Sequence, residues 1–370
     1  MPAWKPILLA ALLAPVLALA IAPAPARAGD RTSLARATTS YGALQKYLYV
    51  PSRRLYRGSP YSFVWPFSQA FAATVAMGSL PGVGGRYDRH VRDRIAGLGS
   101  YWNPDKKPPG YEGAVRPPLG KGGDIGYDDN EWIGLELLRR YQRTHATSML
   151  NRAKQLFSLV VFGWDTDPTH PCPGGVLFSQ ALNNRDRNTV SNAPGVELGL
   201  RLFQVVHDPY YLDWSKRFYN WVQTCMLSAS GLYEDHIDFD GAVDRTIWSY
   251  NQGTMIGSNV LMWKVTGRRG YLRRAQEGAN TALGYFTPSR LRSQPPFFVA
   301  IFMDNLLALD AVRPRSAYRA AVRSYANWAW RARRSAQTGL FNFQTDGGRV
   351  LEQAAMVRIY AALAGAASPV

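Results

Sequence analysis

The sequence predicts an all-α protein, an (α/α)6 toroid or barrel of six inner–outer helix pairs. Apolar residues recur mainly at helical spacing, and a unit of two helices joined by a short polar turn returns several times. The residues that open the second helix of successive pairs lie about 45–60 residues apart, which is typical of a repeated helical hairpin. These anchors are Leu150, Leu212, Leu272 and Tyr318.

The two helices of a unit have different patterns. The first is apolar nearly all round and rich in small residues, which is typical of a buried helix, whereas the second carries Arg, Lys and Gln on one face. Inner helices are expected over residues 132–144, 196–207, 255–266 and 302–312, and further helices near 33–47, 66–79, 87–98 and 353–364. About twelve helices can close into a ring, and an open solenoid is the alternative.

The first 28 residues have the pattern of an export signal. Lys5 precedes an apolar run over residues 7–21, and small residues at Ala26 and Ala28 are suited to cleavage before Gly29. The run is shorter than the ~20 residues that a membrane span needs, although an uncleaved anchor is the alternative. We therefore expect a secreted protein, extracellular, periplasmic or associated with the cell envelope, with residues 29–370 as a single catalytic domain.

The chain is strongly basic, with 43 Lys and Arg against 26 Asp and Glu and a net charge of +17. Removal of residues 1–28 takes away Lys5 and Arg27 and no acid, which leaves +15. The Arg residues are scattered through predicted helices rather than gathered in a stripe, so a nucleic-acid partner is not expected. Attraction to an anionic cell-envelope surface is the more natural expectation for an exported protein.

Two cysteines, Cys172 and Cys225, allow one disulfide or two buried free thiols, and they are too few for a cysteine-based zinc site. The segment 238–241, Asp-Phe-Asp-Gly, lacks the further ligands of a calcium loop. No metal site is expected.

Long loops separate the pairs, at residues 100–128, 163–191 and 229–250, and they are rich in Gly, Asn, Asp and aromatic residues. A ring would bring all of them to one rim, where function is commonly carried. Asp128 and Asp129 stand at this rim, just ahead of the first clear inner helix. They can be an N-cap and a dipole partner, or the two carboxylates that flank the bond cut by a glycosidase.

Amides and aromatic residues precede the later inner helices, over residues 187–192, 248–253 and 294–297. Such side chains suit a neutral polyol, since amides match hydroxyls and rings stack on sugar faces, although Asn192 and Asn251 can also be plain N-caps. The predicted sugar-binding residues are Tyr127, Trp132, Asn192, Tyr250, Asn251 and Gln252.

The ordered motifs resemble those of glycoside hydrolase family 76, the endo-α-1,6-mannanases. The first is Tyr-Asp-Asp at 127–129 with Trp132 three residues on, and the likeness continues through 163–165, 174–176, 191–192, 208–212 and 246–253. It covers roughly residues 60–310. Two departures concern subsite shape: Val-Leu-Phe at 176–178 replaces a tryptophan-rich strand, and Ile133 stands where a second aromatic residue often follows the Trp.

The resemblance implies an (α/α)6 barrel and hydrolysis with retention of configuration, without a metal or organic cofactor. It implies Asp128 as the nucleophile and Asp129 as the acid/base, acting on α-1,6-linked mannan or a mannan-containing lipoglycan. A cell-wall transglycosidase that uses the same carboxylates and a non-catalytic mannan-binding protein are the alternatives.

Overall fold

The computed structural model describes residues 30–366, and the predicted export signal lies outside the described residues. This part of the chain contains thirteen α-helices and seven short strands, so the all-α class is confirmed. None of its helices combines the length and the apolar character that crossing a bilayer requires.

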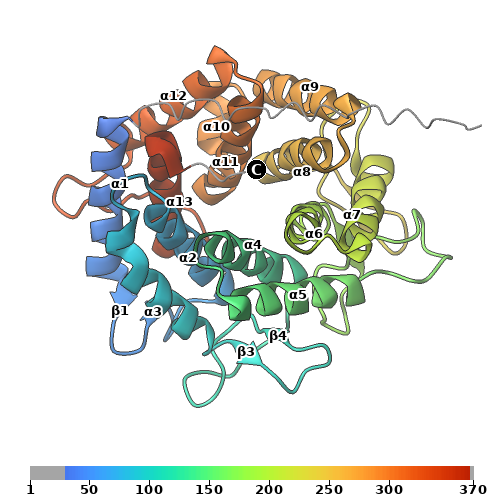
Figure 1. The fold of residues 1–370 in the computed structure, drawn as a ribbon, viewed down its shortest axis with the longest axis horizontal. Coiled ribbons are helices and arrows are strands. Elements are labelled where there is room, and N and C mark those ends of the chain that lie inside the picture. The colour runs from blue at the N-terminus through green and yellow to red at the C-terminus, as the bar shows by residue number, and fades with distance from the viewer. Residues whose placement is uncertain (1–29, 367–370) are drawn as a thin grey trace, which may run out of the picture.

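Six helices form a closed inner ring (Figure 1). Each packs on the next, and the last, α13, packs on the first, α2, so the toroid is confirmed and the open solenoid is wrong. The inner helices are α2 (Val64–Gly78), α4 (Tyr127–Thr144), α6 (Ala193–Val206), α8 (Ser249–Thr266), α11 (Pro296–Val312) and α13 (Gly348–Ala361).

An outer layer surrounds this ring. Five outer helices pack on the inner helix that precedes them, and α1 packs on α13. The outer helices are α1 (Arg31–Ala43), α3 (Asp88–Leu98), α5 (Thr147–Phe162), α7 (Pro209–Trp221), α9 (Arg269–Tyr285) and α12 (Ser316–Ala332), and the short α10 (Pro288–Ser293) lies between α9 and α11 in the chain.

Burial follows the expected pattern of inner and outer helices. Every residue of α8 from Ser249 to Met262 is buried, whereas α9 buries only Ala275, Ala279 and Ala282. One apolar face is enough for an outer helix because its other faces meet solvent.

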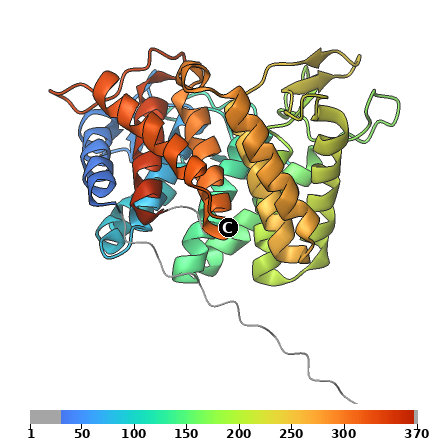
Figure 2. The same cartoon turned by 90° about the horizontal axis from the view of Figure 1, so that it is seen from above.

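The two rims of the ring differ. Three inner helices end in a residue of left-handed conformation, His145, His207 or Gly267, and the outer partner begins two residues later. The opposite rim carries the long loops, which extend along the upper edge in Figure 2.

The rim loops contain all the described strands. They are β1 (Tyr49–Val50), β2 (Leu55–Tyr56), β3 (Trp102–Asn103), β4 (Gly110–Tyr111), β5 (Asp186–Asn188), β6 (His236–Asp238) and β7 (Val243–Asp244). All pairs are antiparallel, and the order β5-β6-β7 joins the loop before α6 to the loop before α8. A disulfide between Cys172 and Cys225 ties the loop before α6 to the π-helical turn Val222–Met226 that follows α7.

Candidate active site

The acidic pair lies in the first turn of α4. Gly126 is the N-cap residue, and Asp128 and Asp129 are the second and third residues of the helix. The sequence pattern placed them ahead of the helix, so the interpretation of either as the N-cap is wrong. Their position at the positive end of the helix agrees with the other part of that interpretation, in which an Asp side chain interacts favourably with the helix dipole.

The two carboxyl groups converge above Gly126. A Cβ atom built on this glycine would lie 3.4 Å from Asp128 Oδ1 and 3.2 Å from Asp129 Oδ2. Because both oxygens are this close to one point, they are no more than about 6.6 Å apart, within reach of one glycosidic bond. Both side chains remain partly accessible to solvent.

The two carboxyl groups differ in proton affinity. Burial raises the pKa of Asp128 to about 7, against the opposing effect of backbone N–H groups at the helix start and of the Trp132 indole. Burial and the neighbouring charge of Asp128 raise the pKa of Asp129 well above its usual range. Asp128 is therefore the member of the pair that ionises around neutral pH, while Asp129 keeps its proton.

Aromatic rings surround the acidic pair. Trp132, Tyr250, Val190 and Ile301 form a small buried cluster apart from the main core. Trp65 packs on Trp132 with ring centroids 6.1 Å apart, and Phe298 stacks on Tyr250 at 4.0 Å. Trp132 and Tyr250 both lie near Asp128, since, besides the larger effects of burial, the Trp132 indole lowers the pKa of Asp128 and the charge of Asp128 raises that of Tyr250. Their contact with sugar stays a prediction, and sequence reasoning missed Trp65 and Phe298.

A third carboxylate, Asp235, was also missed. It contacts His236 Nδ1 at 3.1 Å and accepts from Asn251 Nδ2 at 3.4 Å. Its charge and that of Asp128 both raise the pKa of Tyr250, after the larger effect of burial, so Tyr250 lies near both carboxylates. The available signal was an acidic residue in a long rim loop just before an inner helix.

Four amide side chains share one bonding pattern, which we call the amide pins. Each lies at the start of an inner helix, and its oxygen accepts from the backbone N–H of a buried residue in the preceding rim loop. In three of the four, the nitrogen also donates to the carbonyl of that same residue and to the carbonyl four residues earlier. The pairs are Asn130 with Tyr111, Asn192 with Val176, Gln252 with Tyr233, and, through the oxygen alone, Gln353 with Phe341.

Two of the amide pins, Asn192 and Gln252, had been predicted to contact sugar, and the structure contradicts that prediction. Asn192 is 0% exposed and Gln252 is 2% exposed, and their amide groups are bonded to loop backbone. They position loops rather than face the site. Asn251 keeps a buried side-chain oxygen without a partner among the described residues, so its contact with sugar stays a prediction.

Tyr127 is likewise a core residue. It is 2% exposed, and a Cβ on Gly163 would lie 2.5 Å from its ring, so the ring fills the space that this glycine leaves. The predicted contact of Tyr127 with sugar is therefore wrong. Its position fixes the start of α4, and with it the acidic pair.

Glu131 is a further buried carboxyl group beneath the acidic pair. It is 0% exposed, and neither of its oxygens has a hydrogen-bond partner within residues 30–366. A Cβ on Gly195 would lie 2.7 Å from Glu131 Oε1, so this glycine makes room for the group. Burial, then the charges of Asp128 and Glu197, raise its pKa well above the usual range. This shift favours the neutral form of Glu131.

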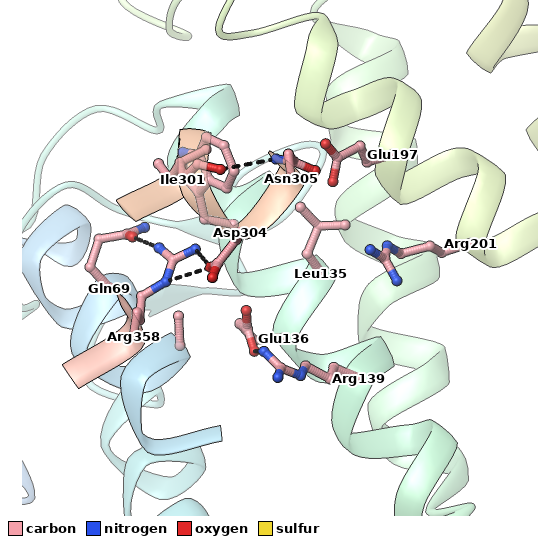
Figure 3. Close-up of a pocket in the computed structure, with 12 residues that line it drawn as sticks. Gln69, Leu135, Glu136, Arg139, Glu197, Arg201, Ile301, Asp304, Asn305 and Arg358 are labelled. Atoms are coloured by element: carbon pink, nitrogen blue, oxygen red, sulfur yellow. Dashed lines mark hydrogen bonds and ion pairs between the residues drawn. The ribbon is translucent and has the colours of Figure 1, made fainter. Parts of the chain in front are cut away.

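Below the aromatic cluster lies a small polar pocket on the axis of the ring, with a cavity volume of about 40 Å³ (Figure 3). Arg358 bridges Gln69 and Asp304, and its Nη2 lies 2.6 Å from Asp304 Oδ2. Trp132 and Ile301 belong both to the aromatic cluster and to the lining of the pocket. The cluster thus separates the site from this charged interior.

One group of side chains has metal-ligand spacing among the described residues, Asp235, His236 and Asp244, with ligand atoms within 4.8 Å of one another. The contact between Asp235 and His236 already explains much of this proximity. Residues 238–241 form the turn between β6 and β7, in which Gly241 N donates to Asp238 O.

Comparison with solved structures places this architecture among known folds. A family 76 mannosidase of Bacteroides thetaiotaomicron superposes with a TM-score of 0.80 and 22% identity, over 90% of this chain and 98% of that one. An inactive variant of the α-1,6-mannanase of Salegentibacter, with two consecutive Asp residues changed to Asn and α-1,6-mannotriose bound, has a TM-score of 0.71 and 19% identity over 90% and 99% of the chains.

Sequence comparison leads to the same family. A mannan endo-1,6-α-mannosidase of Saccharomyces cerevisiae is 24% identical over 184 residues, which are 46% of this chain and 40% of the relative, so the chain matches less than half the length of that relative. The model of glycosyl hydrolase family 76 matches residues 34–365. The chain therefore belongs to glycosyl hydrolase family 76.

Proposed function

We propose that this protein is a secreted, retaining endo-hydrolase of α-1,6-mannan. The observation that carries the proposal is the convergence of two carboxyl groups of unequal proton affinity at the start of α4. The Salegentibacter mannanase supports it, because its variant with two consecutive Asp residues changed to Asn is inactive and holds α-1,6-mannotriose.

The proposed reaction has two displacements. The ionised Asp128 attacks the anomeric carbon while Asp129 donates its proton to the leaving glycosidic oxygen, which leaves a mannosyl ester on Asp128. Asp129 then removes a proton from water, whose oxygen displaces Asp128 from the same carbon. Two inversions give retention.

The spacing of the carboxyl groups favours this route. Retaining glycosidases hold them about 5–5.5 Å apart and inverting enzymes about 6.5–9.5 Å apart, to admit a water. The upper limit of about 6.6 Å between Asp128 Oδ1 and Asp129 Oδ2 includes the retaining spacing and excludes nearly all of the inverting range.

The test is incubation of the mature protein with linear α-1,6-mannan, with products read by size and by anomeric proton NMR. Short oligomers that appear first as the α-anomer are expected. Asp128→Asn and Asp129→Asn should each lower turnover by several orders of magnitude without unfolding the protein. Products that first appear as the β-anomer would overturn retention, elongated chains would favour transglycosylation, and binding without turnover would favour a mannan-binding protein.

A further inference from the structure

The charge of this chain is concentrated in one stretch. Residues 266–335, about a fifth of the sequence, contain thirteen Arg, no Lys and three acidic residues, a net +10 out of +17 for the whole chain. Asp304 faces the axial pocket and Asp310 is 3% exposed. Of the three acids Glu277 is the exposed one, and it pairs with Arg273.

The ring gathers these arginines on one outer wall. The stretch includes the outer helices α9 and α12 and the short α10, which lie together at the top of Figure 1 and face the viewer in Figure 2. Arg315 Nη1 donates to Asn280 Oδ1 at 2.7 Å and joins the start of α12 to α9. We call the α9–α10–α12 wall the basic face. Its exposed arginines are Arg268, Arg269, Arg273, Arg274, Arg290, Arg292, Arg313, Arg315, Arg323 and Arg331.

An apolar groove lies within the basic face. All three helices line it, and its cavity volume is about 220 Å³. Leu283, Phe286 and Leu291 contribute apolar side chains, and Arg292 stands on its wall. A groove of this kind among guanidinium groups matches an amphiphile with an acyl chain and a phosphate, since Arg pairs well with phosphate oxygens.

We propose that the basic face docks on an anionic phospholipid bilayer. The exposed arginines bind headgroup phosphates, and the groove takes part of an acyl chain. A soluble polyanion would satisfy the arginines but would leave the groove empty. The face is part of the side wall of the ring and lies across from α5, so docking leaves the loop rim open (Figure 1). This inference is independent of the proposed reaction.

The test is co-sedimentation of the mature chain, residues 29–370, with vesicles of phosphatidylcholine alone or of phosphatidylcholine with phosphatidylglycerol added. A face variant replaces Arg269, Arg290, Arg292 and Arg323 by Gln. A matched control replaces four exposed arginines on the far side, Arg53, Arg86, Arg89 and Arg92, by Gln. A groove variant, Ala321→Asp, places a carboxylate in the groove.

Anionic vesicles should bind the wild type and the control alike, and phosphatidylcholine vesicles should not. The face variant should bind about a hundredfold to a thousandfold more weakly, since each Arg near an anionic surface contributes on the order of 1 kcal/mol. Thermal unfolding checks that each variant is folded. Equal weakening in face and control variants would overturn the proposal, because net charge would then explain binding. Undiminished binding by the folded groove variant would also overturn it, since the face would then be a general polyanion site.

Discussion

Replacement of Asp128 by Asn should stabilise the protein in a pH-dependent way while it removes activity. The Asp128 carboxyl has a pKa of about 7 in the folded chain, against about 3.8 for an ordinary Asp. A raised pKa means that the folded state holds the proton more tightly than the unfolded state. The stability that results is complete below about pH 4 and is lost as pH rises towards 7.

The size of this stabilisation follows from the raised pKa of Asp128. A shift of about three pKa units corresponds to about 4 kcal/mol at 1.36 kcal/mol per unit. Because Asp128 is partly accessible and titrates together with Asp129, we expect about half of this, roughly 2 kcal/mol at pH 8. For a domain of this size, with about 2.1 cal/mol/K of unfolding entropy per residue, that raises Tm by about 3 °C.

The assay is thermal unfolding of wild type and Asp128→Asn from pH 4 to pH 8. The Tm difference should be near zero at pH 4 and grow with pH, because Asn keeps the acceptor oxygen for the helix N–H groups but never ionises. Asp213→Asn is the control, since Asp213 is exposed and pairs with Lys216 on the surface of α7. A Tm difference that is the same at both ends of the range would refute the raised pKa.

Four further predictions concern the same region. Gly126→Ala places a methyl group against both carboxylates and should lower kcat/KM on mannan by about 10-fold to 100-fold, with Tm nearly unchanged. Glu131→Gln should leave the pH profile of kcat/KM in place if Glu131 is neutral, and a shift of its acid limb would show that it is ionised. Gln252→Ala leaves two backbone groups of Tyr233 unbonded and should lower the free energy of unfolding by about 3 kcal/mol, measured with urea. Cys172→Ser opens a link between residues 53 apart and should cost about 4 kcal/mol, an effect that a reductant should reproduce in the wild type.

The fold could be predicted because it is repeated. Four inner–outer pairs showed the same order of apolar and amphipathic helices, and each pattern depends only on residues within one helix. The starts of the inner helices were predicted less well, since α4 begins at Tyr127 rather than Trp132 and α8 begins at Ser249 rather than Met255. Polar residues in the first turn of a helix have the composition of a loop, so the sequence pattern places the helix start too late.

The acidic pair was found from its motif, but its surroundings were not. Asn192 and Gln252 have the composition of sugar ligands, and only the positions of Val176 and Tyr233 show that their amides are already occupied. Asp235, Trp65 and Phe298 come from three different loops or helices that meet only when the ring closes. The arginines were expected to be dispersed, yet outer helices from adjacent pairs align them on one wall.

The amide pins bear on how substrate preference can change in this fold. Four of the rim loops are fastened at one buried residue, and in three of them this residue (Tyr111, Val176 or Tyr233) lies near the middle of the loop, with loop segments both upstream and downstream of it. Insertions or deletions on either side of that residue can therefore reshape the rim while the fastened residue still registers the loop on its helix. The catalytic turn of α4 is insulated in this way by the bond between Asn130 and Tyr111. Loop length and catalytic geometry can then vary independently over evolution.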